Sequence, residues 1–297
     1  MASLELERLA GRTSFIRGPV NVGVHELDGG RAVLIDAGSD DDAGRKILRA
    51  CEAAGLAVAH ILNTHSNADH CGGNAFIQAR TRCRISATLT EAALIETPVL
   101  EPSYLWGGFP LPPLKNKFLM ARPSSVTDIL VPPCLVAGTE LEAVPLPGHF
   151  LAMVGFRTPD RVFFAADTVA SAEILEKYHL FFYYDLAAQL ETLEALKRID
   201  ADWIVPSHAT PTRDIAPLAD LNRAKIFEVA DRILSLCAEP STQEDLLARL
   251  AEHYGIVLNP AQYVLVGSTL RSYLSWLVNR EELAMQFEAG RLLFRRS

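Results

Sequence analysis

The chain of 297 residues has few cysteines, no long apolar run and no excess of positive charge. Its five cysteines form no CxxC pair, and the segment MASLELERLA contains no apolar leader, so we expect reduced thiols in a cytoplasmic protein. No apolar run approaches the ~18 residues that a membrane span needs. The net charge of −8 argues against broad electrostatic attraction to nucleic acid. Hydrophobic residues at 49% and charged residues at 22% instead indicate an ordinary soluble globular protein.

The N-terminal part of the chain predicts strands separated by short helices. A hairpin is expected around Asp28-Gly29-Gly30, between the runs NVGVHEL and RAVLIDAG. A helix is expected over residues 42–54, because Ile47 and Leu48 share a face and Gly55 can end it. The run AVAHILNT then predicts a buried strand. Its C-terminal end leads into NTHSNADHCGGN, the place where α/β proteins often carry their chemistry.

Residues 94–125 interrupt this regular pattern, and we refer to them as the lid segment. They contain six prolines together with Tyr104, Trp106 and Phe109. Irregular stretches of this length inside a domain often form lids or substrate walls, which is the interpretation we favour. A surface insertion or an oligomer contact is the alternative. Lys115, Lys117 and Arg122 could meet an anionic substrate or be simply solvated.

Strand signals resume at LEAVPLPG, AMVGFRT, RVFFAAD and DWIVPS, with a helix expected over residues 185–198. A long helix over about 217–236 leads away from them. In the last segment we expect a capping box formed by Ser241 and Glu244, a helix start at Asn259-Pro260, and a hairpin turn at residues 288–290. We therefore predict a catalytic domain over residues 1–215, a linking helix over 216–240, and a winged-helix-like C-terminal module over 241–297.

A set of histidines and aspartates stands at the ends of the predicted strands. Behind AVAHIL come His65, Asp69 and His70. The two histidines are five residues apart, which does not match a helical face, so we expect a loop wrapped around a ligand, with Gly72 and Gly73 allowing a tight fold. The other strand-end positions are His149 after VPLPG, Asp167 after VFFAA and His208 after WIVPS. This repeated placement predicts a metal site, whereas Cys71 is expected to be a small packed side chain.

The order of these residues resembles the metallo-β-lactamase superfamily, whose signature is H-x-H-x-D-H followed by later His, Asp and His ligands. The motif stands here as His65-Ser66-Asn67-Ala68-Asp69-His70. The segment LIDAGS, with Asp36, also matches a strand-end aspartate of that family. The resemblance covers residues 12–215. It implies an α/β fold of four layers, the αββα sandwich, and a layout similar to glyoxalase II-like hydrolases.

The resemblance also implies a distribution of metal ligands. A first site would use His65, Asn67 and His149, a second site would use Asp69, His70 and His208, and Asp167 would bridge the two. Zn would be the leading metal, with Fe or Mn as alternatives, in one or two ions. By the same resemblance, a metal-bound hydroxide would attack a carbonyl or phosphoryl centre, and Asp69 could pass a proton to the leaving group.

Asn67 departs from the family pattern, because a neutral amide binds zinc more weakly than an imidazole does. We favour an unequal pair of ions. Alternatively, His65, His149 and Asp167 could hold a single iron, as in persulfide dioxygenases of the superfamily. Asn67 could also turn away and donate hydrogen bonds beside the site. In a third alternative, the protein binds metal without catalysis and acts as a sensor or scaffold.

We expect the substrate to be a small ester, thioester or lactone; a nuclease is the competing expectation, and β-lactam hydrolysis is not expected. Residues 241–297 carry six basic and six acidic side chains, which gives no positive field for phosphate binding. The helix after Asn259 is apolar over much of its surface, so we expect it to pack against the chain or to form a homodimer, as the lid segment also could. The aromatic run Phe181 to Tyr184 could form a pocket wall or a buried helix start.

Overall fold

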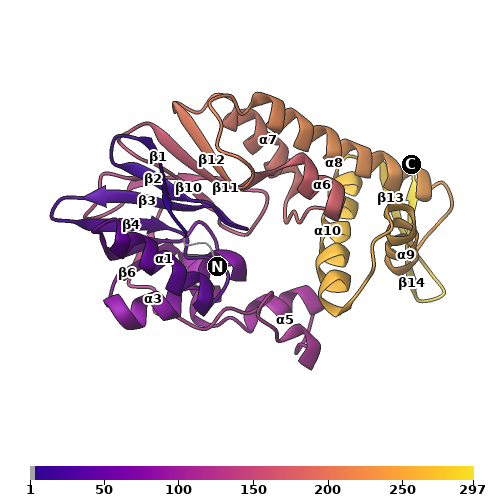
Figure 1. The fold of residues 1–297 in the computed structure, drawn as a ribbon. Coiled ribbons are helices and arrows are strands. Elements are labelled where there is room, and N and C mark those ends of the chain that lie inside the picture. The colour runs from indigo at the N-terminus through magenta and orange to yellow at the C-terminus, as the bar shows by residue number, and fades with distance from the viewer. Residues whose placement is uncertain (1–3) are drawn as a thin grey trace.

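The computed structural model describes residues 4–297, and its main body consists of two sheets packed face to face with helices outside (Figure 1). The first sheet contains, in spatial order, β1 (Leu6–Ala10), β2 (Thr13–Ile16), β3 (Val22–Leu27), β4 (Arg31–Ile35), β5 (Ala57–Leu62), β6 (Arg84–Thr88) and β7 (Asp128–Leu130). The second contains β12 (Trp203–His208), β11 (Val162–Ala170), β10 (Val154–Arg157), β9 (Glu142–Pro145) and β8 (Cys134–Leu135).

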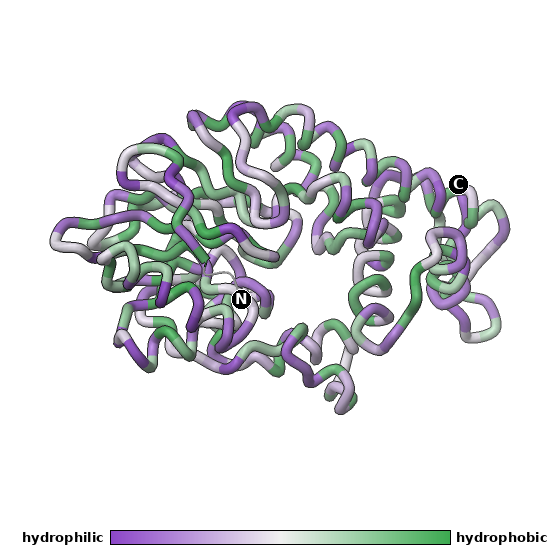
Figure 2. The backbone as a smooth tube through the Cα atoms, viewed as in Figure 1, coloured by the Kyte–Doolittle hydropathy of each residue, from purple (hydrophilic) through white to green (hydrophobic). Residues whose placement is uncertain are grey.

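The strands at the centre of each sheet are buried on both faces. In β4, Val33 and Ile35 face the second sheet, whereas Leu34 packs with Ile47 beneath the outer helices. This alternation follows from the two-residue period of a strand, and the parallel pairing of β4 to β7 accounts for its continuous apolar sequence. Figure 2 shows the resulting hydrophobic strands inside the sandwich and hydrophilic residues at its outer turns.

Helices cover the outer face of each sheet. Next to the first sheet lie α1 (Asp41–Ala53), the one-turn α2 (Ala68–Cys71), α3 (Asn74–Thr81) and α4 (Leu89–Glu96). Next to the second lie α7 (Leu186–Leu196) and α8 (Ala216–Leu236), and α6 (Ala172–Tyr178) packs against α8. Helix α1 begins one residue earlier than predicted, because the Asp40 carboxylate caps it. The predicted hairpin is confirmed, since Gly29 and Gly30 adopt positive φ between β3 and β4.

The lid segment contains more helix than its sequence suggested. The end of α4, the helix α5 (Leu100–Trp106) and a 3₁₀ turn (Pro112–Leu114) lie within it, and no strand forms between β6 and β7. Leu105, Leu114 and Leu119 are buried in a small apolar cluster with Val264 of helix α10 (Pro260–Asn279). The lid segment therefore rests on the C-terminal module, as Figure 1 also shows for α5 and α10.

The C-terminal module consists of α9 (Gln243–Tyr254), α10 and the hairpin of β13 (Leu283–Glu288) and β14 (Arg291–Arg296). The predicted helix start at Asn259-Pro260 is confirmed. The predicted capping box is wrong by one residue: Thr242 and Asp245 form it, because Ser241 pairs with Phe294 in an extended bridge and the helix can begin only after it. The winged-helix likeness and the domain boundaries remain predictions.

Helix α8 does more than link the sandwich to this module. One apolar core runs from Phe163 of β11 through Leu193 and Ile226 to Leu270 and Leu274 of α10. Helix α10 thus packs within the chain, against α5, α7 and α9. Among the helices of residues 4–297, none combines the length and the apolar character needed to cross a membrane.

Candidate metal centre

Six of the seven predicted ligands converge at one edge of the sandwich. His65 lies in the loop after β5, Asp69 and His70 in α2, His149 in the loop after β9, and His208 at the end of β12. Asp167 was expected at a strand end, which is wrong: it lies inside β11. The register of β11 against β12 is irregular on both sides of Ala166, whose φ is +48°, and Asp167 directly follows this bulge.

The nitrogen and oxygen atoms of these side chains lie close enough to surround a cation. His70 Nε2 is 3.1 Å from Asp167 Oδ1, and His208 Nε2 is 3.1 Å from Asp167 Oδ2. His149 Nε2 lies 3.6 Å from Asp167 Oδ2, and the rings of His65 and His149 are 5.3 Å apart. Two overlapping groups could each hold an ion: His65, His70 and Asp167, and Asp69, His70 and His208. Asp167 faces histidines from both.

The nitrogen and oxygen atoms of this cluster are better suited to binding a divalent cation than to being buried without one. His65 Nε2, His70 Nε2, both ring nitrogens of His149, and Asp167 Oδ1 are buried without a partner in hydrogen-bond geometry. Each such atom costs about 1–3 kcal/mol when it is left unsatisfied. Because imidazole nitrogens and carboxylate oxygens suit Zn, Fe and Mn, a bound ion would satisfy several of them together.

The opposite ring nitrogens of three histidines are held by the protein. Asp36 accepts from His70 Nδ1 at 2.8 Å and also from the backbone N–H and hydroxyl of Thr64. The Thr64 hydroxyl donates to Asp36, so it accepts from His65 Nδ1 at 2.9 Å. His208 Nδ1 lies 3.1 Å from the Pro19 carbonyl oxygen, which can only accept. These contacts make Nδ1 a protonated nitrogen in each ring, so Nε2 is the atom that a bound cation would use.

Gly72 and Gly73 fix the position of this loop by close approach. Both have negative φ, so they allow the predicted tight fold through the space they leave and not through unusual backbone angles. A Cβ on Gly72 would lie 2.2 Å from the Ser39 carbonyl oxygen, and one on Gly73 would lie 2.1 Å from that of Ala37. The absence of side chains lets the loop after α2 pack on the loop that carries Asp36.

Electrostatics give the side chains of the cluster different charge states. Burial lowers the pKa of His65 well below its ordinary value and also lowers that of His149, so both rings are neutral ligands at pH 7. Burial opposes ionisation of Asp167, but His208 and His70 hold its pKa well below the usual range. Likewise, burial is outweighed by Asp167 and Asp69, which raise the pKa of His208 to about 10. A cation would displace that proton.

The amide nitrogen of Asn67 has a partner outside the six converging residues. Its Nδ2 donates to Glu101 Oε1 of α5 at 2.8 Å. Burial raises the pKa of Glu101 well above its ordinary value. The hydrogen bond is the behaviour expected from the alternative in which Asn67 lies beside the site. The sequence analysis did not predict roles for Glu101, Pro19 and Thr64. Of these, only Thr64 could have been suspected from the sequence, because it directly precedes His65.

Aromatic rings form one wall of the metal centre. Phe181 and Phe182 lie 5.3 and 5.7 Å from the His149 ring, and Phe150 lies 5.6 Å from His65. Phe181 and Phe182 belong to the loop before α7, which favours the pocket-wall interpretation over a buried helix start. Cys71 donates to the Ser66 carbonyl oxygen, and burial raises the pKa of its thiol, as expected for a packed side chain.

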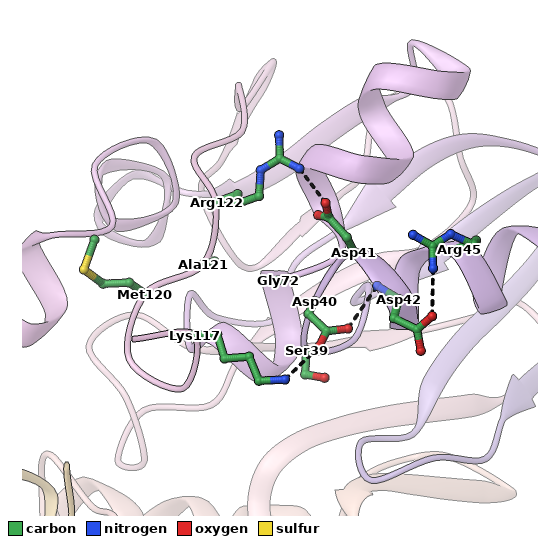
Figure 3. A pocket seen from close by; sticks show the side chains of 10 residues that line it. All are labelled: Ser39, Asp40, Asp41, Asp42, Arg45, Gly72, Lys117, Met120, Ala121 and Arg122. Carbon is green, nitrogen blue, oxygen red and sulfur yellow. Dashed lines mark hydrogen bonds and ion pairs between the residues drawn. The ribbon is translucent and has the colours of Figure 1, made fainter. Parts of the chain in front are cut away.

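Basic side chains of the lid segment contact α1 and not the metal centre. Lys117 Nζ lies 3.2 Å from Asp40 Oδ2, and Arg122 pairs with Asp41 (Figure 3). They line a pocket of about 320 Å³ at the start of α1 that contains none of the predicted ligands. Lys115 lies 4.0 Å above the ring of Phe109. These contacts favour a role in holding the lid segment over a role in binding an anionic substrate.

Comparison with known proteins agrees with this fold. Residues 16–208 match the sequence model of the family described as Metallo-beta-lactamase superfamily. The chain belongs to this superfamily, as the motif order predicted.

Its relatives include a hydroxyacylglutathione hydrolase of Rhodopseudomonas palustris, 31% identical over 149 residues, which are 50% of this chain and 47% of the relative. Another hydroxyacylglutathione hydrolase, from Rhodospirillum rubrum, is 46% identical over 46 residues, which are 16% of this chain and 18% of the relative. The chain thus matches about half the length of the first relative.

Solved structures extend the likeness to the whole chain. A beta-lactamase domain protein from Burkholderia ambifaria has a TM-score of 0.74 at 19% identity and covers 100% of this chain and 94% of its own. A metallo-beta-lactamase family protein from Thermus thermophilus has a TM-score of 0.73 at 20% identity and covers 99% of both chains. At these identities the likeness shows the fold alone, and it confirms the predicted sandwich.

Proposed function

We propose that the protein is a metal-dependent hydrolase of a small ester, thioester or lactone. The observation that supports this most strongly is the group of buried, unpartnered ring nitrogens around Asp167. A fold gains nothing from leaving these atoms unsatisfied, whereas a divalent ion would bind several of them together. The name of the matched relatives, hydroxyacylglutathione hydrolase, is that of an enzyme acting on a thioester, which favours an acyl substrate here.

His65, His149 and Asp167 would hold a first ion, and Asp69, His70 and His208 a second, with Asp167 shared. When bound, such ions lower the pKa of a water molecule and stabilise negative charge at the attacked carbonyl. Asp36, Thr64 and Pro19 hold the imidazole rings of the ligands in place. They contact His70, His65 and His208, respectively. Phe181 and Phe182 form an apolar wall that would exclude water and contact the acyl group.

Asp69 is the best placed residue for proton transfer. Its side chain is 44% exposed, although its Oδ2 lies 3.4 Å from His208 Nε2. Burial is outweighed by His70 and His208, which lower the pKa of Asp69, so it is a carboxylate at pH 7. Asp69 could therefore take a proton from the nucleophilic water and pass it to the leaving group.

Oxygen chemistry at a single iron is the second candidate. The hydrogen bond of Asn67 to Glu101 favours it, because without Asn67 the first site consists of two histidines and a carboxylate. That is the ligand set of non-haem iron oxygenases. Such an enzyme would use His65, His149 and Asp167 and would leave the second site empty.

Elemental analysis of protein purified without chelators or a metal-binding tag distinguishes these functions. About two zinc or manganese ions per chain, with turnover of an ester and thioester panel, would support the hydrolase. His208→Ala should then lose one ion and most activity, while His253→Ala, an exposed histidine of α9, should keep both. One iron per chain would favour the oxygenase. No metal after reconstitution would contradict both and leave a sensor or scaffold.

A further inference from the structure

Glu101 is a buried carboxylate whose presence the fold does not explain. Only 5% of the residue is exposed, and it reaches the metal centre from α5 in the lid segment. Within residues 4–297, the carboxylate of Glu101 accepts one hydrogen bond, the 2.8 Å contact from Asn67 Nδ2. Over residues 4–297, neither a lysine nor an arginine pairs with it.

Glu91 provides a contrast within the same region. It is also fully buried, but its two carboxylate oxygens accept from the backbone N–H groups of Ser66 and Ala152 at 2.9 and 2.8 Å. Glu91 therefore joins two loops of the site and has a structural role. Glu101 has no comparable backbone partners. A buried carboxylate is costly unless it is paired, which indicates that Glu101 is retained for a charge that binds nearby.

We propose that Glu101 is a positioning residue of the first metal site and acts through Asn67. This inference rests on the proposed metal-binding function. The side chain of Glu101 holds the amide group of Asn67. A cation bound by His65, His149 and Asp167 would favour the ionised form of Glu101 and would in turn be attracted by its negative charge. Asn67 and Glu101 together thus replace the histidine that the family motif has at position 67. Coulomb attraction is effective here because both groups are shielded from water.

Helix α5 connects this pair to the rest of the lid segment. Leu105, one turn after Glu101, is buried against Leu114, Leu119 and Val264 of α10. The affinity of the first metal site would therefore depend on the position of the lid segment. The affinity of the second site, built from α2 and β12, would not. Because of this difference, a change in the lid segment should alter the affinity of one ion and not that of the other.

Glu101→Gln tests the proposal, because it removes the charge and keeps the size and hydrogen-bonding capacity. We would measure zinc affinities by competition with a chromophoric chelator and follow site occupancy through the cobalt(II) spectrum. The weaker ion should bind about 10–100-fold less tightly in the variant, as expected for loss of a supporting group, and the tighter ion should be unaffected. Ser103→Ala, a change on the same helix, should alter neither affinity.

Asn67→His supplies the sharper comparison. A histidine at position 67 should bind the first ion directly, so Glu101→Gln should have little effect in the Asn67→His background. The proposal is overturned if Glu101→Gln leaves the affinities of the wild-type chain unchanged, or if it weakens both ions equally in both backgrounds. If Asn67→His does not fold, Glu101→Gln against Ser103→Ala decides alone. A wild type without metal would defeat the proposed function itself, which is a distinguishable result.

Discussion

Asp36 shows how one residue can organise a metal centre that it does not enter. It accepts hydrogen bonds from His70 and twice from Thr64, and its φ of +67° is a conformation that Asn also tolerates. Asp36→Asn should therefore preserve the backbone but replace one acceptor oxygen by a donor. We expect metal affinity to fall about 10–100-fold. Chelator competition would measure this, with the exposed Asp28→Asn as control, and equal affinities would show that Asp36 does not orient His70.

His60 provides a test of burial that is independent of metal. It is 3% exposed beside Ser86 Oγ at 2.7 Å, and burial, followed by the charge of Arg84, lowers its pKa from 6.5 to about 4. The unfolded chain therefore binds a proton more readily than the folded one between these pH values. The contribution of neutral His60 to the free energy of unfolding is fully present above about pH 6.5. It should fall by roughly 3 kcal/mol as the pH approaches 4.

Denaturant titrations of metal-free wild type and His60→Gln over this pH range would isolate that contribution, because the other histidines are common to both. The stability advantage of the wild type should shrink as the pH falls. A constant difference would mean that His60 titrates normally in the folded protein.

At the scale of elements, tight contacts between segments place the ligands. Gly148, directly before His149, has φ +131°, and a Cβ there would lie 2.4 Å from the Gln189 Cα of α7. Gly148→Ala should therefore displace the loop, weaken metal binding, and cost more than backbone strain alone. Gly255→Ala is the matched control, since Gly255 has φ +65° with open space around it and should lose about 1–2 kcal/mol.

The free energy of unfolding and the metal content of both glycine variants would decide the matter. Gly148→Ala should lose at least twice the stability that Gly255→Ala loses, and Gly255→Ala should keep its metal. Equal losses in the two variants would show that α7 yields to the added methyl group and does not fix the position of His149.

At the scale of the molecule, the C-terminal module and the metal centre share a core through α10 and the lid segment. Leu105→Ala should cost about 2–5 kcal/mol, because Leu105 is 1% exposed and its loss leaves a cavity. If α5 positions Glu101, the affinity for the first ion should fall as well. Leu100→Ala, on the same helix but 42% exposed, should change little. Stability loss without any change in metal affinity would separate α5 from the site.

Much of this organisation could be predicted from local pattern. The order of His65, Asp69, His70, His149, Asp167 and His208 along the chain identified the superfamily. The Gly29-Gly30 turn and the Asn259 cap could also be predicted, because turns and caps depend on neighbouring residues. The shift of the capping box to Thr242 was not readable, since it depends on the distant partner Phe294. The bulge at Asp167 likewise depends on pairing with β12.

The amino-acid order by itself thus determined which side chains could bind metal and which strands would carry them, because ligand type and strand period are properties of short segments. The tertiary structure alone decided which groups support them. Glu101 and the Pro19 carbonyl oxygen meet Asn67 and His208 only after segments 34 and 189 residues apart come together. No local pattern encodes such a contact, since its energy comes from burial and electrostatics that exist only once the sheets have packed.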